Sequence, residues 1–528
     1  MGVERPTAVL TPPARGSSAA TPGSERARSG EAEARRQRFL ATSGLMLATA
    51  LQAADATIVN VALPRLEHDL GGAELGAWVI ASYLCATAVT APLTGWLRRR
   101  TGARRLYWLA LGAFTFASLL CASAPTGAML VAFRIFQGAG AGVLLPLSQA
   151  ILLELYPKER HGRMLAAWGA ALMVGPIVGP PLGGFITDVS SWRGAFLINL
   201  LFGGIVVILL RGLRRPEERV PEERLDPVGV VALMVGVGAL ELCLQRGIGR
   251  PWLTSPDLLA EAALAAIALA VMILRGRRGG FSVVRPDVFK DANFAAAAFY
   301  NFMTSGLLFV SVVFIPALGE GPLGYRATLA GLTIVPRAVL MMLLMLFVGR
   351  LIGRVDFRIL LGSGWVLMAA GLAVLANARA ADGLLWIVVG STIQSAGAGL
   401  LFTPLSALAF SSLAPELRTD AAGVYSLLRQ LGFATGVTVM TAVLRLMLEP
   451  QAADLGPTLA AYSRCFGVMA IASLAVIPGI FVFRPPPQPD PRGQKARLAF
   501  RKNRHGRARP ASTRPSPEAP RSPGQAQR

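Results

Sequence analysis

The stretches QGAGAGVLLPLS (Gln137–Ser148) and QSAGAGLLFTPLS (Gln394–Ser406) decide the fold of this 528-residue chain. They repeat one pattern at an offset of 257 residues, which becomes 258 after one inserted residue. Other matches keep the same order at nearly the same offset: Gly95, Leu97, Arg100 and Arg104 with Gly349, Leu351, Arg354 and Arg358, and Pro157 and Arg160 with Pro415 and Arg418. The chain therefore contains two homologous halves.

The composition places both halves in a membrane. Hydrophobic residues make up 53% of the chain and charged residues only 16%, too few to cover a soluble domain of this length. Apolar runs of about 20 residues recur, and a helix of that length crosses a bilayer. We predict an all-α membrane protein with fourteen transmembrane helices near residues 39–63, 75–97, 106–124, 128–154, 163–187, 195–211, 226–245, 256–274, 292–316, 327–349, 359–377, 384–410, 420–447 and 462–483.

The repeat also predicts how the chain is divided. Residues 226–274 match neither half, so we expect a two-helix insertion between two six-helix bundles. Paired halves in a membrane protein imply a substrate site between them and alternating access by rocking. The predicted parts are a disordered N-terminal tail (1–38), the first bundle (39–211), the insertion with its flanking loops (212–290), the second bundle (291–483) and a basic disordered C-terminal tail (484–528).

The net charge of +22 lies mostly in the tails and the short loops. The C-terminal tail contributes +10 and the N-terminal tail +3, and basic residues on alternate loops outnumber those on the opposite loops more than two to one. Because loops rich in Lys and Arg stay in the cytoplasm, we predict that both termini lie there. Contact with anionic lipid explains this charge, and we expect no nucleic-acid partner.

The sequence offers no evident metal or cofactor site. The cysteines and histidines are scattered without paired or clustered spacing, at Cys85, Cys121, Cys243, Cys465, His68, His161 and His505. No GxxxxGK[ST] phosphate loop is present, which excludes an ATP-driven pump within this chain. We therefore expect a protein that is not an enzyme and that needs no cofactor.

Seven segments, in order, carry a resemblance to a known family: ADATIVNVALP (Ala54–Pro64), GWLRRRTGARR (Gly95–Arg105), RIFQGAGAGVLLPLSQ (Arg134–Gln149), GPIVGPPLGG (Gly175–Gly184), WRGAFLIN (Trp192–Asn199), LDPVG (Leu225–Gly229) and GYRATLAGL (Gly324–Leu332). Over residues 40–483 the chain resembles the major facilitator superfamily, specifically its fourteen-helix drug:proton antiporters of EmrB/QacA type, and most of all the EmrB-like branch.

The resemblance implies a bacterial inner-membrane exporter of small lipophilic compounds such as drugs, dyes and toxic amphiphiles. Export would be driven by the proton gradient and would confer multidrug resistance. Exporters of EmrB type also work with a periplasmic adaptor and an outer-membrane channel, so both are candidate partners.

Asp55 and Arg134 are the predicted proton-coupling residues. A carboxylate inside a membrane span is costly, and it usually faces a cavity where it has a function. Arg134 matches the arginine of the family's fourth-helix motif, whereas its counterpart in the second half is Ser391, so the repeat itself does not require it. The alternative is that Asp55 only packs the helix, satisfied by Thr57 or Asn60.

Other polar and small residues fill two further predicted roles. Substrate-cavity candidates are Thr57, Asn60, Gln137, Gln394, Arg337 and Arg429. The gating and antiporter motifs contribute Gly95, Arg100, Gly102, Arg104, Gly175, Pro176, Gly179, Pro180, Gly183 and Gly184. The family's loop carries an aspartate where Arg99 stands, and this departure argues against the usual charge-relay latch between the halves.

Three alternative functions compete with export. The same fold could serve a substrate-specific transporter of a metabolite or fatty acid, or an uptake symporter. The GPxxGG pattern at Gly179–Gly184 and the two-helix insertion argue against uptake. A transport-inactive sensor or a membrane-embedded enzyme is the third alternative, and the pair of ionisable residues, Asp55 and Arg134, favours transport over it.

Overall fold

A computed structural model describes residues 22–71, 74–211, 227–247, 254–277, 286–320, 323–324, 333–377, 383–448 and 455–483, all within one compact unit, Met1–Arg484. The described residues form helices, and their only strand-like feature is an isolated bridge between Ile352 and Val355. The prediction of an all-α protein is therefore confirmed.

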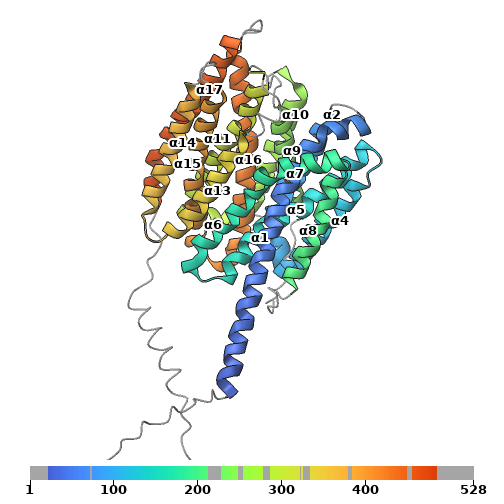
Figure 1. Ribbon diagram of the computed structural model, residues 1–528, viewed down its shortest axis with the longest axis vertical. Helices are drawn as coiled ribbons and strands as arrows, with labels where there is room; N and C mark the ends of the chain where they lie inside the picture. The colour runs from blue at the N-terminus through green and yellow to red at the C-terminus, as the bar shows by residue number, and fades with distance from the viewer. Residues whose placement is uncertain are drawn as a thin grey trace, which may run out of the picture. The chain divides into compact units, whose positions relative to one another are not determined.

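The helices follow the two halves of the sequence (Figure 1). The first half forms α1 (Pro22–Leu70), α2 (Glu74–Thr90), α3 (Thr94–Thr101), α4 (Ala103–Ala122), α5 (Gly127–Leu155), α6 (His161–Leu172), α7 (Val174–Val189) and α8 (Gly194–Leu210). The insertion forms α9 (Pro227–Gly247) and α10 (Pro256–Arg277). The second half forms α11 (Ala292–Glu320), α13 (Ile334–Leu351), α14 (Phe357–Ala376), α15 (Gly383–Ser411), α16 (Arg418–Met447) and α17 (Leu455–Ala475).

Every one of the fourteen predicted spans overlaps a helix. By length and composition, eleven helices of the described residues can cross a membrane, or twelve if the bent pair of α2 and α3 counts as one span. The remaining two ranges fall on α1 and on α8, an apolar helix of 17 residues. The helical character of all fourteen ranges is thus confirmed, and fourteen crossings stay a prediction.

Two predicted spans are broken rather than continuous. The chain bends by 58° between α2 and α3, next to Pro92. The span predicted at 163–187 is divided at Met173 into α6 and α7, three residues before Pro176. Proline lacks the backbone N–H that would bond the carbonyl four residues earlier, so it weakens a helix at these points.

The N-terminal tail also departs from the prediction. Residues 22–38, which we expected to be disordered, belong to α1, so that expectation is wrong for them. This stretch is rich in Ala, Glu and Arg, which favour helix. The Gln37 amide also donates to Glu33 over 3.0 Å, one helical turn away.

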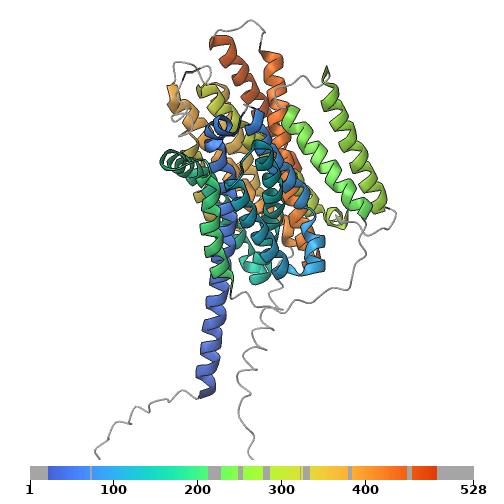
Figure 2. The same cartoon turned by 90° about the vertical axis from the view of Figure 1, so that its right-hand side faces the viewer.

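The inserted helices α9 and α10 form a hairpin beside the bundles (Figure 2). Arg246 near the end of α9 pairs with Asp257 over 2.8 Å and also with Glu261, both on α10. Helix α9 packs on α2 and α16, and the Thr438 hydroxyl of α16 donates to the Leu244 carbonyl over 2.8 Å. The insertion is therefore attached to both halves.

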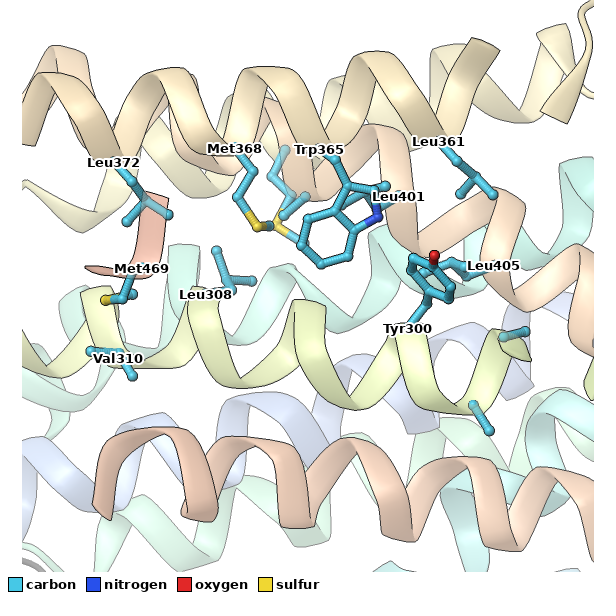
Figure 3. Packing of buried hydrophobic residues seen from close by; sticks show 14 of the residues in the cluster. Tyr300, Leu308, Val310, Leu361, Trp365, Met368, Leu372, Leu401, Leu405 and Met469 are labelled. Carbon is cyan, nitrogen blue, oxygen red and sulfur yellow. The ribbon is translucent and has the colours of Figure 1, made fainter. Parts of the chain in front are cut away.

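The core of the second half is aromatic and aliphatic (Figure 3). Trp365 of α14 is fully buried, and its ring centroid lies 5.9 Å from that of Tyr300 on α11. Around them pack Met368, Leu372, Leu401 and Leu405 from α14 and α15. Helices α11, α14 and α15 thus share one apolar interior.

Glycines allow helices of the second half to touch through their backbones. A Cβ added at Gly436 of α16 would lie 2.7 Å from the Gly306 Cα of α11, and one at Gly432 would overlap the Phe302 carbonyl. Small residues of this kind are the usual means by which membrane helices approach closely.

We predict that Gly432→Val lowers the thermal unfolding midpoint of the purified protein by several degrees, because overpacking typically costs about 1–3 kcal/mol. The matched control is Gly362→Val on α14, where an added Cβ meets nothing within 4 Å among the described residues. Equal midpoints for the two variants, measured by tryptophan fluorescence in detergent, would contradict this packing.

Candidate functional site

Asp55 is fully buried in α1 and is surrounded by donors. Its Oδ2 accepts from the Arg134 guanidinium over 3.0 Å, and its Oδ1 accepts from the Gln137 amide over 3.0 Å and from the Asn199 amide over 2.6 Å. Arg134, only 2% exposed, also donates to the Gln137 Oε1 over 2.6 Å. The two predicted proton-coupling residues are therefore in direct contact.

Four helices supply this site. The Ser118 hydroxyl of α4 accepts from Gln137 over 2.7 Å and from Asn199 over 3.2 Å. We call Asp55, Ser118, Arg134, Gln137 and Asn199 the buried network; its members come from α1, α4, α5 and α8. It ties together four of the helices in the first half.

Aromatic rings complete the surroundings of Arg134. Its guanidinium carbon lies 4.1 Å from the centroid of the Tyr83 ring and 5.7 Å from that of Phe196. The face of an aromatic ring attracts a cation, most strongly away from water. Arg134 is thus balanced by one carboxylate and by two ring faces.

The charges of this site depend on each other. An ion taken out of water loses several kcal/mol of hydration, and only a close counter-ion with further hydrogen bonds offsets that loss. Asp55 and Arg134 meet this condition together, and neither meets it alone. Any event that neutralises Asp55, such as protonation, therefore leaves Arg134 buried without its counter-ion.

The glycines of α7 pack on α1 next to Asp55. A Cβ at Gly175 would overlap the Ala53 backbone, one at Gly179 would overlap the Thr57 hydroxyl, and Gly183 approaches Ile58. Thr57 also donates to the Gly175 carbonyl over 3.0 Å rather than to Asp55. Ala53 and Thr57 are one helical turn apart, so α7 covers one face of α1.

Some of the predicted motif residues take no part in this packing. A Cβ at Gly184 meets nothing within 4 Å among the described residues. The side chains of Asn60, Pro176 and Pro180 lie outside the part that the structure describes. The alternative that Asn60 satisfies Asp55 therefore remains untested.

The loop motif joins the two halves through an ion pair and a hydrogen bond. Arg99 of α3 donates to Asp420 of α16 over 2.5 Å, and Asp420 is 1% exposed. Arg98 donates to Thr419 and pairs with Glu154 of α5 over 2.5 Å. We call these contacts of Arg98 and Arg99 with Thr419 and Asp420 the inter-half latch.

The inter-half latch corrects one expectation from the sequence. The missing aspartate argued against the usual charge-relay latch between the halves. A charged contact nevertheless forms here, with the cation, Arg99, in the loop motif and the anion, Asp420, on α16. Gly95 makes the approach possible, because a Cβ there would overlap the Asp420 carboxylate. Of the other loop residues, Gly102 has a positive φ of 84°, Arg100 lies over the Trp96 ring at 5.9 Å, and Arg104 is exposed.

The remaining cavity candidates lie in the second half and, among the described residues, form no hydrogen bond or ion pair with the buried network. Gln394 is fully buried and donates to the Leu307 carbonyl over 3.1 Å. Arg337 is buried beside Ser395, with Nε and Oγ 3.0 Å apart. Arg429 lies 5.8 Å from the ring of Trp168, so it faces α6 of the first half.

The sequence did not predict several residues of these sites, among them Ser118, Asn199 and Asp420. Asn199 is the only amide in the apolar run Gly194–Leu210, and a lone amide in a membrane span was the available signal. Ser118 gives no such signal, because serine is common in membrane helices. Asp420 stands in the first turn of α16, where an acidic residue is ordinary.

The latch predicts a charge-swap experiment. Arg99→Asp places two carboxylates together, so the halves should separate on this face. Separation is measured with a cysteine introduced at Ala91, which is buried in the wild type. In the Arg99→Asp variant this cysteine should react several-fold faster with a maleimide. The double variant Arg99→Asp, Asp420→Arg should restore the slow rate in a background without the native cysteines. Arg100→Asp, an exposed neighbour, is the control, and an unrestored double variant would contradict the latch.

Comparisons with known proteins agree with this geometry. Residues 45–437 match the family model described as Major Facilitator Superfamily. The chain is 33% identical to the "Multidrug export protein EmrB" of Haemophilus influenzae over 76% of this chain and 80% of that one. It is 32% identical to the "Fatty acid resistance protein FarB" of Neisseria gonorrhoeae over 76% and 79%.

The fold matches solved transporters as well. The structure of the human organic anion transporter MFSD10 shares 17% identity with a TM-score of 0.60, covering 85% of this chain and 99% of that one. The helical architecture, the repeated halves and the family model all lead to one assignment: this chain is a multi-pass membrane transporter that belongs to the major facilitator superfamily.

Proposed function

We propose that this protein exports small lipophilic compounds across the bacterial inner membrane in exchange for protons, and thereby confers multidrug resistance. Its family and its similarity to multidrug export proteins support export. The observation that carries the coupling is the fully buried ion pair of Asp55 and Arg134. A membrane-embedded carboxylate with a single cationic partner is the kind of group that binds and releases a transported proton.

Protonation of Asp55 supplies the switch in this mechanism. The neutral acid no longer balances Arg134, so the guanidinium, Gln137 and Asn199 rearrange their hydrogen bonds. These side chains lie on α5 and α8, so their rearrangement alters how α1, which carries Asp55, packs against both helices. A proton shifts the equilibrium between two conformations only if it binds one of them more tightly, and this difference in helix packing would supply that preference.

Helix α1 connects this switch to α7. Asp55 points toward α5 and α8, whereas Ala53 and Thr57, two residues to either side, contact the glycines of α7. Residues two apart on a helix lie on nearly opposite faces, so a movement of α1 at Asp55 acts directly on α7. The antiporter motif and the acidic residue would then work as one unit.

Alternating access follows from the two halves. The inter-half latch holds one face closed, and its release would let the halves rock apart on that side. The basic loops support a cytoplasmic position for this face and for both termini. A periplasmic adaptor and an outer-membrane channel are the partners that similarity to EmrB suggests, and the proton gradient is the energy source, with no cofactor.

The decisive test is dye efflux from energised cells that express wild type or Asp55→Asn. Asparagine keeps the size of the side chain but cannot carry a proton, so efflux should fall to the level of wild-type cells treated with a protonophore. Efflux is followed by fluorescence at equal membrane expression of each variant.

Asp257→Asn is the matched control, because Asp257 is a half-exposed carboxylate on the inserted hairpin and should be dispensable. Efflux by Asp55→Asn that matches wild type and still stops with the protonophore would exclude Asp55 as the coupling residue. Efflux that survives the protonophore in wild type would exclude proton coupling altogether.

A further inference from the structure

Arg337 is a cation held deep inside the second half. This residue is 3% exposed, and its guanidinium contacts residues near the middle of α11 and of α15. Its Nε donates to the Ser395 hydroxyl of α15 over 3.0 Å, and its Nη2 approaches the Leu308 carbonyl of α11 at 3.5 Å. Arg337 therefore lies between α11, α13 and α15.

Among the residues that the structure describes, no carboxylate forms an ion pair with this arginine. Within the described ranges, Arg337 has no ion pair, and its Nη1 has no hydrogen-bond partner. Arg134, the buried arginine of the first half's network, has Asp55, Gln137 and two aromatic rings. The buried arginine of the first half therefore has a counter-ion, whereas that of the second half has none among the described residues.

Further buried polar groups on α11 and α15, the helices that Arg337 contacts, also lack partners among the described residues. Thr304, Leu308 and Ser311 share one face of α11, since their spacing is four and then three residues. Both hydroxyls are fully buried and unpartnered among the described residues, as is the Gln394 Oε1 of α15. The opposite face of α11, at Gly306, packs on α16, so this polar face is turned away from that contact.

An arrangement of this kind is unfavourable unless something binds to it. Buried polar groups in folded proteins are nearly always satisfied, and an unpaired buried charge is among the costliest exceptions. An apolar residue at this position would pack in the apolar core of the second half without that cost. The geometry therefore favours an external anion as the missing partner.

Two apolar side chains of α13, Met341 and Met345, lie between Arg337 and the contact of the two halves. They follow Arg337 at intervals of four residues on the same face of α13, and both are buried. Met345 contacts Gly169 of α6, in the first half. Methionine is flexible and polarizable, so it adapts to apolar groups of different shape.

We infer that Arg337 anchors the acidic head group of an amphiphilic anion, whose apolar chain lies along Met341 and Met345 toward the interface of the two halves. This inference rests on the proposed function, because it names a substrate class for that exporter. The forked guanidinium suits a carboxylate or a sulfonate, whose oxygens accept charge-assisted hydrogen bonds.

The test compares three probes with the same ten-carbon chain: decanesulfonate, decanol and decyltrimethylammonium. Binding to the full-length protein in lipid nanodiscs is measured by calorimetry for wild type, Arg337→Gln and Arg337→Lys. Arg337→Gln should weaken decanesulfonate about ten- to hundredfold, as expected for loss of a hydrogen bond between charged groups, and leave the other two probes within about twofold. Arg337→Lys should bind decanesulfonate with intermediate affinity.

A structural role for Arg337 would give a different pattern. Equal weakening of all three probes, or a large drop in thermal midpoint without ligand, would show that Arg337 only supports packing. Unchanged decanesulfonate binding in Arg337→Gln would equally overturn the inference.

Transport in proteoliposomes with an imposed pH gradient separates this inference from the proposed function. Decanesulfonate stays charged at neutral pH, so its movement reports the protein rather than leakage. Gradient-driven transport of decyltrimethylammonium but not of decanesulfonate by wild type would refute the anion site and leave proton-driven export standing. Transport of neither probe would refute the export mechanism, while the nanodisc binding pattern still decides whether Arg337 binds an anion.

Discussion

The ion pair between Asp55 and Arg134 is the interaction on which the first half depends. Either charge alone would be costly inside the membrane, so the ion pair holds α1 and α5 in contact at this point. Gln137 and Asn199 donate to the same carboxylate, and Ser118 accepts from both of them, which brings α4 and α8 to the same place. One electrostatic requirement thus fixes the arrangement of four helices and also makes that arrangement sensitive to a proton.

The two halves meet at two places that the repeat relates to each other. Gly95 packs against Asp420 of α16, and its counterpart Gly349 packs against Ala166 of α6. Glycine is needed at both positions because each allows one half to touch the other closely. Among the described residues, the first contact carries an ion pair and the second does not, so the two interfaces differ in strength, in salt dependence and in what can release them.

The repeated motif that begins at Gln137 and at Gln394 has different hydrogen-bond partners in the two halves. Gln137 and Gln394 occupy equivalent positions, yet Gln137 bonds to a carboxylate and Gln394 to the Leu307 carbonyl. The first half is neutral at its centre, whereas the second holds Arg337 with no counter-ion among the described residues. A proton site in one half and an anion site in the other would let the two ligands bias one rocking equilibrium from separate positions.

The sequence by itself determined the helices, and it predicted the two halves, the insertion and the roles of Asp55 and Arg134, two residues that the structure brings into contact. Hydropathy, internal repetition and a charge inside an apolar run can all be read directly from the order of the amino acids, without a structure. Tertiary structure decided the partners: Asn199 for Asp55, and Asp420 for Arg99 across 321 residues. Such pairs depend on which helix faces meet, and that follows from packing over the whole bundle, which no single stretch of sequence encodes.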